Sequence, residues 1–200
     1  SDRTLVSEFV GAQAEMGDHQ VAAATIASMA AGLETAAAVD LMLHAARQLI
    51  AVEGAGEAAA ELVEDVRRRQ PEAWEPVIVL AEAYVAAGRV EEARPLAANA
   101  VAAFEGRRSK TLAAAYHAMA SVERASGNAV DALAQLSKSF EVDPTNVDYA
   151  LELGQFAVDR GEADVAARAL RVVTMAKTSS SGVSSRQKAL GYYHLGRLAA

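Results

Sequence analysis

"AWEPVIVLAEAYVAAGRVEEARPLAANAV" occupies residues 73–101 and places apolar residues at helical spacing on both sides of Gly88. The two apolar stripes consist of Val77, Leu80, Ala81 and Tyr84, and of Ala93, Leu96, Ala97 and Ala100. Spacings of three and four residues put each set on one side of an α-helix. Glycine adopts positive φ without steric cost, so Gly88 is a natural end for the first helix. The stretch therefore predicts two amphipathic helices joined by a tight turn.

The same pattern recurs along the whole chain. Glycines stand at similar intervals of 37, 34, 39 and 34 residues: Gly17, Gly54, Gly88, Gly127 and Gly161. Five residues after each glycine comes an alanine: Ala22, Ala59, Ala93, Ala132 and Ala166. Seven residues before the turn, Ala81, Ala120 and Gly154 are also small, whereas the second unit has Arg47. Small residues at both positions allow the paired helices to approach closely. The period predicts an array of helix–turn–helix repeats.

These columns resemble the tetratricopeptide repeat (TPR), a family of 34-residue helix–turn–helix units. The third unit and the fifth, "VDYALELGQFAVDRGEADVAARALRVV", match best, and Leu153-Gly154 and Leu195-Gly196 repeat the Leu-Gly pair of the family. The resemblance implies an all-α fold, a right-handed α-solenoid. We expect a single solenoid over residues 1–200, as a piece of a longer chain. Its repeats are expected at about 3–33, 40–71, 74–107, 113–144 and 147–178, with a half repeat at 186–200.

Gly54-Ala55-Gly56 also invites a different interpretation, because glycine-x-glycine before a helix can hold a pyrophosphate. A dinucleotide loop needs a preceding β-strand, and "LMLHAARQLIAV" before it has helical periodicity instead. The two glycines are therefore interpreted as the turn of the second repeat. The Ser-rich stretch at 178–185 is predicted to be a flexible connector.

Composition and motifs argue against an enzyme. The chain contains no cysteine, and no nucleophile elbow, P-loop, metalloprotease motif or carboxylate pair stands in a suitable setting. We therefore predict no catalytic residues, no cofactor and no metal. His44, His117 and His194 fall in the second, fourth and sixth units, too far apart to share one ion. They are interpreted as hydrogen-bonding or packing residues.

Charge and hydropathy exclude two classes of partner. The net charge of −7 gives no basic field for nucleic acid, and the run Arg67-Arg68-Arg69 is offset by Glu64 and Asp65. The chain is 52% hydrophobic, yet no apolar run is long enough to span a bilayer. We predict neither nucleic-acid binding nor membrane insertion. The compartment is left open, with the cytoplasm slightly favoured.

Repeat matching places one face of each first helix in a concave groove, where a partner is expected to bind. The predicted groove residues are Ser7, Glu8, His44, Gln48, Glu75, Ile78, Glu82, His117, Ser121, Asp148, Leu151, Glu152, Gln155, Tyr193, His194 and Arg197. Family members that grip chaperone tails use Lys, Asn and Arg there, and this set has only Arg197. Its acidic residues predict a peptide of basic character, with Ile78 and Leu151 as apolar contacts.

The sequence thus predicts a non-enzymatic protein-interaction scaffold. The alternative is a docking or sensory segment of a longer enzyme or transcription regulator. The half repeat at 186–200 lacks a second helix and carries Tyr192, Leu195, Leu198 and Ala199 on one stripe. We expect it to self-associate or fray.

Overall fold

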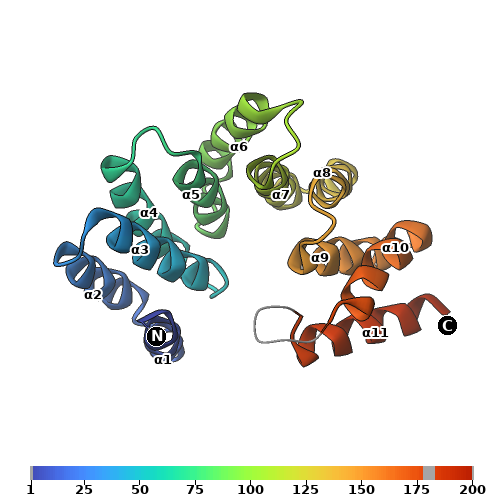
Figure 1. Cartoon of the computed structure of the whole chain (residues 1–200), viewed down its shortest axis with the longest axis horizontal. Helices are drawn as coiled ribbons and strands as arrows, with labels where there is room; N and C mark the ends of the chain where they lie inside the picture. The colour runs from blue at the N-terminus through green and yellow to red at the C-terminus, as the bar shows by residue number, and fades with distance from the viewer. Residues whose placement is uncertain (1, 178–182, 200) are drawn as a thin grey trace. The chain divides into compact units, whose positions relative to one another are not determined.

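The computed structural model describes residues 2–177 and 183–199, which form eleven α-helices and no β-strand (Figure 1). The predicted all-α, helix–turn–helix repeat fold is confirmed. The predicted connector at 178–185 lies largely outside the described residues. Within the described part of the chain, none of the helices has both the length and the apolar character needed to cross a bilayer.

The chain divides into two compact units, Ser1–Ala103 and Phe104–Ala200. The first unit contains α1 (Asp2–Met16), α2 (His19–Ala31), α3 (Thr35–Ile50), α4 (Gly56–Arg69), α5 (Trp74–Ala86) and nearly all of α6 (Val90–Phe104). The second contains α7 (Lys110–Ala125), α8 (Ala129–Val142), α9 (Val147–Val158), α10 (Ala163–Met175) and α11 (Ser185–Ala199). Odd-numbered helices are the first helices of the repeats.

A glycine of positive φ lies in the turn after each of the first helices α1, α3, α5, α7 and α9, as the sequence pattern predicts. All five have φ between 75° and 80°. In four turns the amide that follows the glycine donates to the carbonyl five residues back, as in Arg89 N to Tyr84 O at 2.7 Å and Glu162 N to Ala157 O at 2.9 Å. This six-to-one bond caps the helix end and reverses the chain.

Small residues set the distance between the two helices of a repeat. The alanines five positions after the turn glycines (Ala22, Ala59, Ala93, Ala132 and Ala166) are all completely buried. Opposite Ala166, Gly154 of α9 is packed so closely that a Cβ there would lie 2.5 Å from Leu170 Cδ2 of α10. Small residues at these contacts therefore allow close packing of the helices, although aromatic side chains are few.

The second repeat departs from the sequence alignment at one position. Arg47 was assigned to the small-residue column, yet its side chain is exposed, whereas the neighbouring Ala46 is completely buried. The cause is a longer turn: α3 ends at Ile50, four residues before Gly54, so the register of the helix shifts. Gly56 then begins α4 against the end of α5, where a Cβ would lie 2.2 Å from Ala87 N.

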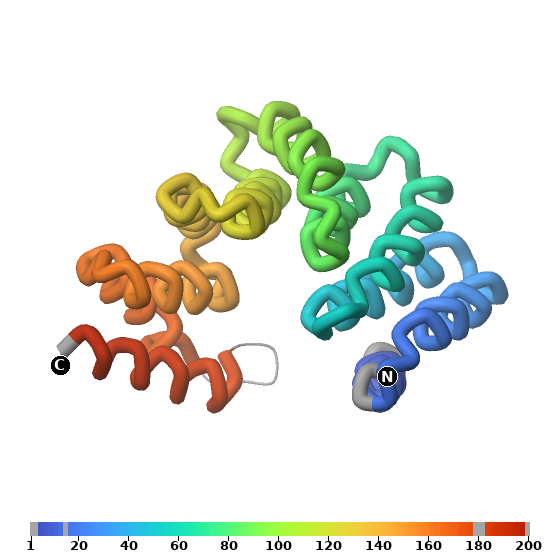
Figure 2. The backbone as a smooth tube through the Cα atoms, turned by 180° about the vertical axis from the view of Figure 1, so that it is seen from behind, coloured from blue at the N-terminus to red at the C-terminus, as the bar shows by residue number. Residues whose placement is uncertain are grey.

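Each unit has its own apolar core. The core of the first unit lies between the helix pairs α1–α2, α3–α4 and the facing side of α5, with Met42, Leu49 and Leu80 among its fully buried side chains. In the second unit, Leu153 and Leu170 are completely buried in the core formed by α7, α8, α9 and α10. Helix α11 lies against α9 and α10 (Figure 2). The stacking holds the first helices of each unit side by side.

Candidate partner-binding face

The predicted groove residues lie on the first helices of the repeats, and we call this surface the first-helix face. In the first unit it comprises Ser7 and Glu8 of α1, His44 and Gln48 of α3, and Glu75, Ile78 and Glu82 of α5. In the second unit it comprises His117 and Ser121 of α7, Asp148, Leu151, Glu152 and Gln155 of α9, and Tyr193, His194 and Arg197 of α11. Each unit presents its own portion of the face.

In the first unit, polar side chains link neighbouring first helices. Ser7 Oγ and His44 Nε2 are hydrogen-bonded at 3.0 Å between α1 and α3. Arg47 of α3 donates to Glu75 Oε1 of α5 at 2.6 Å, and both side chains are largely exposed. A pair this accessible to water contributes little stability, about 0–1 kcal/mol. It does, however, place a cation directly beside one of the predicted binding carboxylates.

In the second unit, the corresponding link between α7 and α9 is a cluster of four side chains. Glu152 is bound by His117 Nε2 at 2.7 Å and by Arg124 Nη1 at 2.8 Å. The His117 ring stacks on Tyr149, with centroids 4.7 Å apart. Burial of Glu152 raises the pKa of its carboxyl, but the hydrogen bond and charge of His117, with Arg124, outweigh it and hold that pKa below its usual value. The cluster therefore favours an ionised Glu152.

Between α9 and α11 the same kind of link occurs twice. Gln187 donates to Asp148 Oδ1 at 2.6 Å, and Arg197 donates to Asp159 Oδ1 at 2.9 Å. His194 beside Arg197 is buried, and its Nδ1 has no hydrogen-bond partner within the described part of the chain. Burial, with the nearby Arg197 charge, lowers the pKa of His194. Both effects favour the neutral form of the ring.

Two of the predicted contact residues have a packing role. Ile78 and Leu151 are 4% and 9% exposed, so they offer a partner almost no apolar surface. Gln48, Glu75 and Asp148 remain exposed, and Ser121 and Gln155 are half-buried. The accessible part of the first-helix face is consequently more polar than the sequence pattern predicts.

Sequence matching also missed the cations of this face. Arg47 was assigned to a helix-packing column, and Arg124 lies three residues before a turn glycine, outside the columns used to define the groove. In the structure these arginines bind Glu75 and Glu152. The expectation of an acidic groove with almost no opposing charge is thus wrong, because part of its negative charge is neutralised internally.

Surface cavities occur away from the predicted residues. One of about 370 Å³ is lined by residues of α7, α8 and the turn before α7, among them Arg108, Tyr116 and Lys138. Another of about 300 Å³ lies between the second helices α2 and α4, beside Glu61 and Arg68. Across residues 2–177 and 183–199 no three acidic or histidine side chains come together as metal ligands would.

Comparison with known families agrees with this geometry. The tetratricopeptide repeat family matches residues 53–116, which span the second helix of the second repeat (α4), the third repeat (α5 and α6) and the start of α7. Residues 53–116 thus match the tetratricopeptide repeat family, and the helix–turn–helix units on either side have the same form. TPR units form protein–protein interaction scaffolds, so proteins are the class of partner that its fold indicates.

A solved TPR structure has the same fold. A thermophilic TPR protein of Thermus thermophilus is 25% identical, with a TM-score of 0.53 over 80% of this chain and 84% of that one. MamA of Desulfovibrio magneticus is 15% identical over 88% of this chain and 93% of its own, with a TM-score of 0.46. No curated protein matches the chain significantly in sequence.

Proposed function

We propose that this TPR protein is a non-enzymatic scaffold that binds a segment of a partner protein along the first-helix face. The bound segment has basic character, and the first unit is its principal site. The residues expected to contact the segment are the exposed Gln48 and Glu75, together with Glu8 and Glu82 on the same face. Exposed polar side chains on packed helices can form hydrogen bonds and ion pairs without rearrangement of the backbone.

The observation that carries this proposal is the uneven charge of the two units. Residues 1–103 contain sixteen Asp and Glu against seven Lys and Arg, a net charge of −9, whereas residues 104–200 have a net charge of +2. The first unit therefore attracts cations, and complementary charge mainly accelerates encounter and selects the partner. A basic segment is the ligand that fits this field.

Fluorescence anisotropy with matched peptides tests the proposal. Basic and acidic peptides of equal length and apolar content are titrated with the protein at low and high salt. We expect the basic series to bind more tightly and to weaken with salt, because exposed charges are screened. In the variant Glu75→Gln/Glu82→Gln, affinity should fall about threefold to tenfold, which corresponds to roughly 0.7–1.4 kcal/mol.

A matched control separates the face from general charge. Glu61 of α4 is exposed on a second helix, beside the cavity between α2 and α4. Glu61→Gln removes one negative charge of the same unit away from the first-helix face. It should leave affinity nearly unchanged. Equal binding of acidic peptides, or an equal loss in Glu61→Gln, would contradict the proposal.

A second element of the proposal concerns α11. The exposed Tyr192 and Tyr193 form an apolar surface on this helix. We infer that the protein self-associates through it, as the half repeat predicted from sequence implies. The stripe differs from the predicted one, since Leu195 and Leu198 pack against the core of the second unit.

A further inference from the structure

Exposed apolar side chains are concentrated on the first two and last two helices. Among the described residues, ten large apolar side chains are exposed, and eight of them belong to residues 5–33 or 175–193. These eight are Leu5, Met16, Val21, Met29, Leu33, Met175, Tyr192 and Tyr193. The seven helices α3–α9 contribute only Trp74 and Val130. Clustered exposed apolar surface marks an interaction site, whereas isolated residues do not.

At the N-terminal end, the exposed residues lie on one side of each helix. Leu5 and Met16 of α1 are eleven residues apart, a spacing that returns to nearly the same side of a helix. Val21 and Met29 of α2 are eight apart and likewise share a side. The opposite sides of these helices, including Val10 and Ile26, are buried in the core of the first unit. The outward side of each helix thus presents apolar side chains, and we call the two outward sides together the N-terminal surface.

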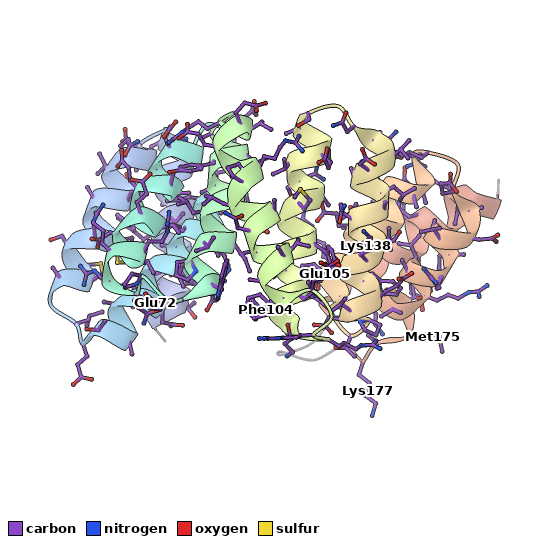
Figure 3. All side chains as sticks on the ribbon, turned by 90° about the horizontal axis from the view of Figure 1, so that it is seen from above. Glu72, Phe104, Glu105, Lys138, Met175 and Lys177 are labelled. Atoms are coloured by element: carbon purple, nitrogen blue, oxygen red, sulfur yellow. The ribbon has the colours of Figure 1, made fainter. Side chains whose placement is uncertain are left out.

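At the C-terminal end, α11 is packed on one side only. Gly191 faces Thr174 and Val173 of α10, where an added Cβ would lie 3.1 Å from Thr174 Cγ2 and 3.2 Å from Val173 Cγ1. Tyr193 lies roughly 200° around the helix from Gly191, so its ring points away from the core. Tyr192 and Tyr193 are 61% and 62% exposed, and Met175 at the end of α10 also lies at the surface (Figure 3). We call this the C-terminal surface.

The two surfaces carry opposite charge. Residues 2–31, which contain α1 and α2, have four acidic residues and one arginine. In α11 there are three cations, Arg186, Lys188 and Arg197, and no acidic residue. Opposite charge around two apolar surfaces steers them together and disfavours contact of either with itself. Charge complementarity therefore selects the N-terminal surface of another molecule as the occupant of the C-terminal surface.

We propose that the protein assembles head to tail, the C-terminal surface of one copy binding the N-terminal surface of a second copy. This deepens the self-association part of the proposed function and is independent of peptide binding. Because the two surfaces differ, the contact is heterologous, and each added copy leaves one free surface of each kind. Assembly should therefore proceed beyond a dimer as concentration rises.

Sedimentation velocity on the 200-residue chain, over a range of concentrations, tests this assembly. Tyr192→Ser/Tyr193→Ser blocks the C-terminal surface, and Leu5→Ser/Val21→Ser blocks the N-terminal surface. Each variant alone should be a monomer where the wild-type chain is assembled. An equimolar mixture of the two should form a heterodimer and nothing larger, because each variant retains one complementary surface. Val130→Ser, at a side chain that is 83% exposed on α8, is the matched control and should assemble like the wild type.

Charge exchange gives a second, independent measurement if a serine variant fails to fold. Arg186→Glu/Lys188→Glu should raise the concentration needed for half-assembly about tenfold, and a chain that also carries Asp18→Lys should regain part of the assembly. A wild-type chain that stays monomeric at every concentration overturns the proposal. Self-association of the Leu5→Ser/Val21→Ser variant alone would also overturn it, since contact would then join two C-terminal surfaces. Neither result bears on peptide binding, which is measured separately.

Discussion

Gly154 of α9 lies directly against Leu170 of α10, so closely that a Cβ on the glycine would be 2.5 Å from both Cγ and Cδ2 of the leucine. Leu170 is completely buried. The glycine is therefore required for the approach of the two helices, not for backbone flexibility, because it lies in the interior of α9.

Gly154→Ala is expected to destabilise the protein by about 1–3 kcal/mol, because the added methyl group overpacks the contact with Leu170. Gly196→Ala is the matched control: Gly196 also lies inside a helix, and its Cβ would have no neighbour within 4 Å. That change should stabilise by about 0.5–1 kcal/mol. Urea denaturation of the two variants measures the difference, and equal effects would show that the contact is not rigid.

Gly56→Ala should destabilise more strongly, by about 2–3 kcal/mol, because its Cβ would lie 2.2 Å from the backbone nitrogen of Ala87. Backbone atoms cannot move aside as the end of a flexible side chain can. Gly32→Ala is the control, since its nearest neighbour would be Met29 O at 3.8 Å. Thermal melting, monitored by circular dichroism, measures the stability of both variants. A Gly56→Ala variant that melts like Gly32→Ala would disprove the close approach of α4 to α5.

Ala93→Leu and Ala132→Leu are each expected to cost about 1–3 kcal/mol of unfolding free energy, since both alanines are completely buried at a helix–helix contact. Ala102→Leu, at an exposed position of α6, should change stability by less than about 0.5 kcal/mol. Chemical denaturation provides the comparison. Unchanged unfolding midpoints for both buried variants would refute the repeat register.

The pH dependence of stability should depend on Glu152. Its pKa is lowered in the folded protein by His117 and Arg124 in spite of its burial, so the ionised form stabilises the fold. This contribution is complete above the unfolded-state pKa of about 4.3 and is lost as pH falls through the lower folded-state value. Glu152→Gln should therefore destabilise by about 1–3 kcal/mol at pH 7.

Denaturation of the wild type and Glu152→Gln is compared at neutral pH and at pH values below the folded-state pKa of Glu152. The difference between the two proteins should shrink toward acid, because the wild-type carboxyl is then protonated in both states. Asp131→Asn on α8 is a control, since Asp131 is exposed. A difference that stays constant with pH would mean that Glu152 acts through packing and not through its charge.

The sequence by itself determined the helices, their turns and their repeat. Positive φ at the five turn glycines and complete burial of the five alanines follow from local spacing, because a period of about 34 residues constrains each unit in the same way. The resemblance to the TPR family implied an all-α fold of helix–turn–helix repeats, and that prediction is confirmed. The candidate site residues were placed on the first helices by the same spacing.

Tertiary structure decided which of those side chains are accessible and which charges are paired. Ile78 and Leu151 are buried by neighbouring helices, and Arg47 binds Glu75 across 28 positions of sequence. The register of the second repeat likewise shifted, with Ala46 buried in place of Arg47, because its turn is longer. Helical periodicity specifies the side of a helix on which a residue lies. Which side chains of the next repeat contact that residue depends on how the helices pack. Sequence spacing within one helix does not contain that information.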